Sequence, residues 1–120
     1  MQTTDQEIKN LVVDLAASVE AFHERFGIVG PAADAELLSR IPIQDEEVRE
    51  LHDALLHETP DRAASEAADV LFVAIGTLLR LDPDLAVAAL REVIEKNNAK
   101  TQETHHINSA GKVVRRAGTG

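Results

Sequence analysis

Six acidic residues form two short clusters that could hold a metal ion. The first is the run Asp45-Glu46-Glu47-Val48-Arg49-Glu50, and the second is Glu66-x-x-Asp69. At about 100° per residue along a helix, the three glutamates of the run share one side, with Glu47 at the border of the apolar stripe. Taken alone, the run is as consistent with a solvated acidic face as with a ligand site.

The second cluster lies where uncompensated carboxylates are costly. From Ala63 to Leu81, apolar residues surround almost the whole circumference of a predicted helix, so this helix is expected to be buried on most sides. Glu66 and Asp69 are three residues apart and share one face of it. Arg62 is the only nearby cation along the helix, and one arginine does not neutralise two acids. The pair therefore predicts either an exposed helix end or a bound cation.

A tight turn joins the helices that carry the two clusters. Thr59-Pro60 has the pattern of an N-cap followed by a proline at the first helical position, so the helices can pack antiparallel with their acidic faces opposed. The side chains that would then converge are Glu47, Glu50, Glu66 and Asp69. Four converging carboxylates form an all-oxygen site suited to Mg²⁺ or Mn²⁺. Mg²⁺ held by protein carboxylates usually also binds substrate phosphates as ligands, so the site favours phosphate-ester or anhydride chemistry.

Helical periodicity extends along most of the chain. The capping box Thr4-x-x-Glu7 precedes the first helix, which ends before Gly27 and Gly30-Pro31. Further helices are predicted at about 34–41, 44–58, 60–81 and 83–98. The short links make the last three antiparallel neighbours. We expect an all-α antiparallel bundle of four to five helices, the catalytic domain 1–100, followed by a polar tail, 101–120, that is extended or loosely ordered.

Composition excludes several classes of function. The chain has 120 residues and no cysteine, which excludes disulfides, zinc–thiolate sites and thiol nucleophiles. The net charge of −9 disfavours binding to a nucleic acid polymer. With no signal-peptide pattern and no membrane-spanning apolar run, a soluble cytoplasmic protein is expected. The apolar circumference of the helix predicted at about 60–81 exceeds what one small bundle can cover, which predicts a homodimer or homotetramer.

The acidic pattern resembles that of a known superfamily. Glu46-Glu47-x-x-Glu50, followed after fifteen residues by Glu66-x-x-Asp69, is similar to the EExxE…ExxD signature of the all-alpha NTP pyrophosphatases. This superfamily includes MazG-like proteins, dimeric dUTPases and phosphoribosyl-ATP pyrophosphohydrolase. Asn97-x-x-Lys100, Gly111-Lys112-Val113 and Phe22-His23 also resemble elements of the MazG-like and phosphoribosyl-ATP-pyrophosphohydrolase-like members. The resemblance covers roughly residues 8–116.

The resemblance implies an oligomeric helical bundle that binds Mg²⁺ and hydrolyses a nucleotide substrate between its α and β phosphates. Its products would be a nucleoside monophosphate and pyrophosphate. The implied metal ligands are Glu47, Glu50, Glu66 and Asp69, and Glu46 would orient or deprotonate the attacking water. The candidate substrate contacts are His23, Asn97, Lys100, Lys112 and Arg115. Cations are needed there because the carboxylate site repels the triphosphate. The sequence does not identify the nucleotide.

Two other interpretations remain open at this stage. One is a helical dimerisation or nucleotide-binding module that keeps the fold without catalysis. The other is a di-iron carboxylate bundle, which uses two Glu-x-x-His pairs on helices. Such pairs occur at Glu20-x-x-His23 and Glu103-x-x-His106, although the second lies in the polar tail.

Overall fold

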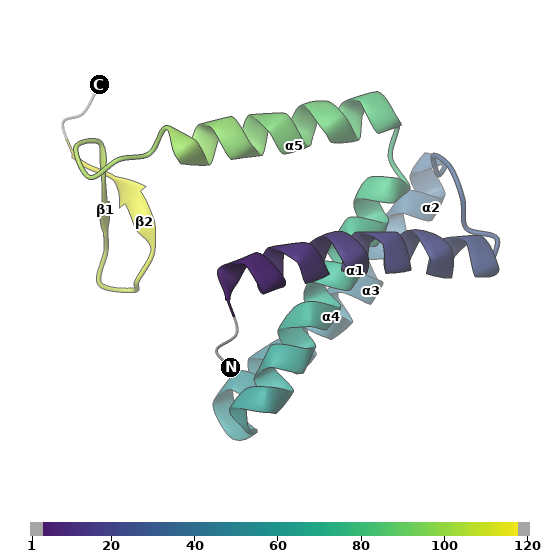
Figure 1. Ribbon diagram of the computed structural model, residues 1–120, viewed down its shortest axis with the longest axis horizontal. Coiled ribbons are helices and arrows are strands. Elements are labelled where there is room, and N and C mark those ends of the chain that lie inside the picture. Colours follow the sequence, from purple (N-terminus) through teal and green to yellow (C-terminus); the bar gives the residue numbers. More distant parts are fainter. Residues whose placement is uncertain (1–3, 118–120) are drawn as a thin grey trace. The chain divides into compact units, whose positions relative to one another are not determined.

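A computed structural model describes residues 4–117 of the chain (Figure 1). Its helices are α1 (Asp5–Arg25), α2 (Asp34–Leu38), α3 (Arg40–His57), α4 (Pro60–Leu79) and α5 (Pro83–Asn98), and its strands are β1 (His105–Ile107) and β2 (Val113–Arg115). The predicted all-α class is thus confirmed. The chain divides into two compact units, residues 1–86 and residues 87–120. None of the described helices is long and apolar enough to cross a membrane.

The residues predicted to begin or end helices make the expected local hydrogen bonds or adopt the expected dihedral angles. Thr4 is the N-cap of α1, and its hydroxyl accepts a hydrogen bond from the Glu7 backbone N–H at 3.2 Å, as a capping box requires. Gly27, which follows the end of α1, has φ +70°, a conformation that glycine adopts at little cost. Pro60 is the first residue of α4, after the extended N-cap residue Thr59.

Helix α3 begins four residues earlier than the sequence predicted. Its first residue is Arg40 rather than Gln44, and α2 accordingly ends at Leu38 rather than near Ile41. Pro42 is therefore the third residue of α3. In the first turn of a helix the backbone N–H has no intrahelical acceptor, so a proline there removes no hydrogen bond. For that reason Pro42 does not shorten the helix.

Side-chain hydrogen bonds set the register between α3 and α4. Gln44 donates to the Val70 carbonyl at 3.2 Å. Arg40 donates to the Val73 carbonyl at 2.9 Å and to the Thr77 hydroxyl at 3.0 Å. These bonds join successive turns of the two helices, which pack against each other. They therefore fix which turn of α3 lies opposite Glu66 and Asp69.

Helix α1 packs on α4 where Gly76 leaves room for two side chains. A Cβ atom at Gly76 would lie 2.8 Å from Arg40 Nη2 and 3.0 Å from His23 Nε2. His23 is buried there, 5% exposed. The pair Phe22 and Phe72 meets edge to face beside it, with ring centroids 5.5 Å apart. Gly76 therefore allows the close packing of helices α1, α3 and α4 at this point.

We expect Gly76→Ala to destabilise the protein. Alanine favours a helix over glycine by about 1 kcal/mol, but overfilling a packed site costs about 1–3 kcal/mol. Here the added methyl would meet the Arg40 guanidinium, which two hydrogen bonds hold in place. Thermal unfolding followed by circular dichroism should show a lower Tm. A higher Tm, as helix propensity alone predicts, would contradict the close approach.

The polar tail, predicted to be extended or loosely ordered, forms a small β-hairpin. Strands β1 and β2 are antiparallel, with His105 opposite Arg115 and Ile107 opposite Val113. The Asn108 side chain accepts hydrogen bonds from two backbone N–H groups of the turn, each at 3.0 Å, and Gly111 has φ +83°. Such asparagine and glycine positions are typical of tight turns. The hairpin belongs to the same unit as the greater part of α5.

Candidate metal centre

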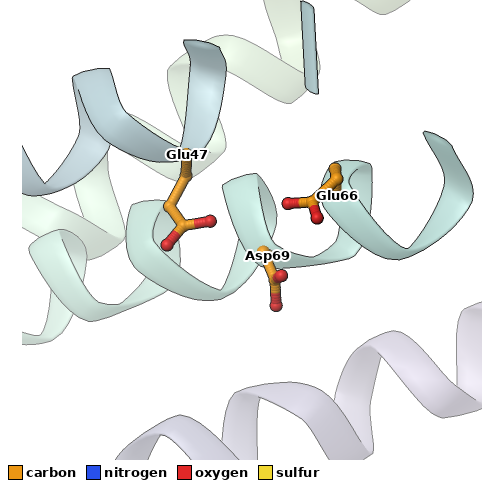
Figure 2. Close-up of side chains that lie close together, drawn as sticks. All are labelled: Glu47, Glu66 and Asp69. Carbon is orange, nitrogen blue, oxygen red and sulfur yellow. The ribbon is translucent and has the colours of Figure 1, made fainter. Parts of the chain in front are cut away.

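Three of the four predicted ligands converge between α3 and α4. Glu47 on α3 and Glu66 and Asp69 on α4 each offer one carboxylate oxygen within 4.8 Å of the other two (Figure 2). Oxygens about 2.1 Å from an octahedral Mg²⁺ are at most about 4.2 Å apart. A small adjustment of side chains would therefore bring all three onto one ion. Among residues 4–117, these three form the one such group of acidic or histidine side chains.

The burial of these carboxylates fits a cation site. Glu66 is only 7% exposed, Glu47 is half-buried and Asp69 is exposed. The Oε2 atoms of Glu47 and Glu66 are both buried, and neither has a hydrogen-bond partner among the described residues. Buried polar atoms without partners are rare because they lose their hydration without compensation. A bound divalent cation would satisfy both oxygens.

Mutual repulsion perturbs the same carboxyls. Burial raises the pKa of Glu47, and the charges of Asp69, Glu66 and Glu46 raise it further. Burial also raises the pKa of Glu66, and the nearby charge of Glu50 adds to that increase. These shifts mean that the ionised cluster is unfavourable by itself. The positive charge of a bound divalent cation would lower the pKa values of these carboxyls instead.

Glu50 and Glu46 lie beside this group but are not part of it. The Glu50 side chain is exposed and acts on the pKa of both Glu47 and Glu66, so it lies next to two of the three convergent ligands. Glu46 is exposed, and its charge acts on Glu47. Glu46 is thus close to the centre without converging on it.

Arg62 is the cation nearest the cluster along α4. Its Nη2 atom lies 2.9 Å from Glu66 Oε1, and its Nε atom lies 3.5 Å from Glu58 Oε1. From the sequence, Arg62 is expected only as an insufficient counter-charge. Its spacing of four residues from Glu66 was the signal that it would contact that carboxylate.

The structure does not bring His23 to the carboxylates. His23 packs against Gly76, which is seven residues beyond Asp69 and therefore about 10 Å further along α4. Its pKa is lowered by burial and by the charges of Arg40 and Arg80, so burial and both arginines favour the neutral imidazole.

The other predicted substrate contacts lie in the second unit, residues 87–120. Lys100 donates to Asn97 Oδ1 at 2.9 Å. Lys100 and Arg115 line a shared cleft of about 290 Å³ together with Lys96 and His105. Lys112 does not line this cleft. Sequence reasoning did not select Lys96 or His105, although Lys96 is one helical turn before Lys100.

The second Glu-x-x-His pair does not have the geometry of a di-iron bundle. Glu103 precedes β1 and His106 lies within it, so this pair is not on a helix. The arrangement needs two helical pairs facing each other. The acidic group between α3 and α4 remains as the candidate metal centre.

Comparison with known proteins gives the family. Residues 31–98 match the family model for phosphoribosyl-ATP pyrophosphohydrolase. The match covers more than half of the chain, including all of α3 and α4. No curated protein and no solved structure matches the chain. The family consists of metal-dependent pyrophosphohydrolases, which fits the acidic group of Figure 2. The chain therefore belongs to the phosphoribosyl-ATP pyrophosphohydrolase family, within the MazG-like all-alpha NTP pyrophosphatase superfamily.

Proposed function

We propose that this protein is a Mg²⁺-dependent nucleoside triphosphate pyrophosphohydrolase. It cleaves between the α and β phosphates and releases a nucleoside monophosphate and pyrophosphate. The observation that carries the proposal is the convergence of Glu47, Glu66 and Asp69 with two buried, unpartnered carboxylate oxygens. In a chain of a pyrophosphohydrolase family, hard-cation chemistry on a polyphosphate is the best explanation of that site.

In this mechanism, Glu47, Glu66 and Asp69 hold the ion, with Glu50 beside them as a fourth carboxylate. When bound, Mg²⁺ supplies positive charge that offsets the charge developing on phosphoryl oxygens. Glu46 orients the attacking water and accepts its proton. The water oxygen joins the α phosphorus while the bond from that phosphorus to the bridging oxygen breaks. Pyrophosphate leaves with that bridging oxygen.

The basic cleft of the second unit is suited to holding the polyphosphate. Residues 87–120 contain six Lys and Arg against three Glu, whereas residues 1–86 contain six against eighteen acidic residues. No ion pair of Lys96, Lys100 or Arg115 with a carboxylate occurs within residues 4–117. We propose Lys100 and Arg115 as phosphate contacts, with Asn97 holding Lys100 in place. We propose Lys112 as a further phosphate contact and His23 as a contact to the base.

The proposal predicts turnover of at least one nucleotide in a panel of NTPs, dNTPs and phosphoribosyl-ATP with Mg²⁺. Chromatography should show the monophosphate and pyrophosphate as the primary products, and EDTA should abolish the reaction. Orthophosphate as the primary product would refute α–β cleavage. A folded, Mg²⁺-binding protein with no turnover on any member would instead support the non-catalytic module.

A further inference from the structure

Within residues 4–117, Arg62 and Glu66 form the one close ion pair at the metal centre. Arg62 Nη2 lies 2.9 Å from Glu66 Oε1, a distance typical of a charge-assisted hydrogen bond. The other oxygen of the same carboxylate, Oε2, is buried and has no partner. The two oxygens of Glu66 are thus in different situations, one held by an arginine and one free.

We propose that Arg62 is a positioning residue of the metal centre. By holding Oε1, it fixes the plane of the Glu66 carboxylate and leaves Oε2 available to the cation. A carboxylate with one oxygen held loses the freedom to turn about its last bond, so less order has to be imposed when the ion binds. The inference rests on the proposed Mg²⁺ site and adds a residue that does not itself touch the ion.

The contacts of Arg62 indicate what fixes its own orientation. Its Nε atom lies 3.5 Å from Glu58 Oε1, and Glu58 caps the C-terminus of α3. Arg62 therefore bridges the α3–α4 turn and the ligand one helical turn further on. The guanidinium can make both contacts because it is planar and has several donors, whereas a lysine offers one flexible ammonium.

A merely structural role predicts a different result from a positioning role. The Arg62 side chain is 54% exposed, whereas that of Glu66 is 9% exposed, so removing Arg62 leaves a mostly buried carboxylate without its counter-charge. A merely structural role therefore predicts a lower metal-free Tm and an unchanged Mg²⁺ affinity. A positioning role instead predicts an effect on metal affinity.

A purely electrostatic role predicts an effect of the opposite sign. Arg62 places positive charge beside a cation site, so its removal alone should make Mg²⁺ bind more tightly. If positioning dominates, removal makes Mg²⁺ bind more weakly. The sign of the change in affinity therefore separates the two roles.

The test compares Arg62→Gln, Arg62→Lys and the control Arg49→Gln. Arg49 is exposed on α3, about 200° around that helix from Glu47, so its variant loses the same charge away from the three convergent ligands. Mg²⁺ affinity is measured by calorimetry without nucleotide, and metal-free stability by thermal unfolding. Mg²⁺ dependence of turnover is measured for each variant.

We expect Arg62→Gln to weaken Mg²⁺ binding about 10-fold or more, within the range for groups that orient metal ligands. Its metal-free Tm should fall, because Glu66 loses its counter-charge in the metal-free protein. The Mg²⁺ concentration for half-maximal turnover should rise, while kcat at saturating Mg²⁺ largely recovers. Arg62→Lys should recover part of the affinity, and Arg49→Gln should match the wild type.

Unchanged or tighter Mg²⁺ binding in Arg62→Gln would overturn the inference, even if its Tm fell. If Arg62→Gln did not fold, Arg62→Lys alone would decide by the same measurement. If the wild type bound no Mg²⁺, the proposed function would fail first. If the wild type binds Mg²⁺ and Arg62→Gln binds it with the same affinity, only the positioning role would be refuted.

Discussion

Glu46→Gln is expected to lower turnover by about 10²–10⁴-fold, the usual contribution of a general base, while Mg²⁺ and nucleotide still bind. Glu46 is exposed and adjoins Glu47, whose pKa its charge helps to raise. It is not one of the three side chains that converge in Figure 2. Glu46 can therefore approach a water at the metal centre without being a principal ligand.

Asp69→Asn should fail in a different way, by losing Mg²⁺ affinity. Asp69 is one of the three convergent ligands, and a neutral amide oxygen is a poorer ligand for a hard cation than a carboxylate. Calorimetry with Mg²⁺ and a non-hydrolysable nucleotide, beside kinetics on both variants, separates the two failures. Asp45→Asn is the matched control, because it removes one exposed charge from the same acidic run. Near-normal turnover in Glu46→Gln would show that this division of roles is wrong. The same conclusion would follow if Glu46→Gln lost metal binding as severely as Asp69→Asn.

The same variant should change how the metal-free protein responds to pH. The pKa values of Glu47 and Glu66 are raised in the fold, and Asp69 contributes to both increases. An acid with a raised folded-state pKa binds more protons when folded, so stability falls as pH rises from the ordinary Glu pKa toward the raised one. Wild-type protein in EDTA should be more stable in mild acid than at neutral pH. Asp69→Asn should reduce that difference and be the more stable of the two at neutral pH.

The helices and the acidic centre were predictable because their signals are local. Glu66 and Asp69 interrupt an otherwise apolar helix, and the Thr59-Pro60 start makes that helix the direct neighbour of α3. The start of α3 was less predictable. A proline such as Pro42 is consistent with either a helix boundary or a first turn, and only the packing of Arg40 against α4 decides between them.

Features that depend on pairing between distant residues could not be predicted. The cleft with Lys96 and His105 forms because the hairpin register places His105 opposite Arg115, and three-residue strands carry little pattern of their own. The family resemblance predicted His23 as a substrate contact. Its burial against Gly76 instead depends on how α1 packs on α4. His23 is a buried histidine at that helix contact.

The second large effect that we expect is self-association through the exposed apolar side chains of the protein. Within residues 4–117 the buried apolar side chains are Val19, Ala54, Val73 and Ala86. Large apolar side chains remain exposed on each of the helices α1, α3, α4 and α5. They include Leu11 and Val13 on α1, Leu55 and Leu56 on α3, and Val93 and Ile94 on α5. A core this small stabilises a fold weakly, and exposed apolar area of this extent marks an interface.

Helix α4 indicates which face another copy would cover. Its Glu66 side faces α3, and Phe72 faces α1 through Phe22. Leu71 lies about 140° around the helix from Glu66, away from both contacts, and is 37% exposed. Ala67 and Ala68 on the same side are exposed as well, and such small residues let another helix approach closely.

We therefore expect a homodimer or homotetramer at low micromolar concentration, and little or no monomer of 13.0 kDa. A stable interface buries about 1,200–2,000 Å² in total, so a charge placed on its face should disrupt it. In sedimentation experiments, Leu71→Glu should shift the protein toward the monomer. The control Val29→Glu, which changes an exposed apolar residue in the connector after α1, should not. A clean wild-type monomer would refute self-association, and a Leu71→Glu protein as oligomeric as the wild type would place the interface elsewhere than on this face of α4.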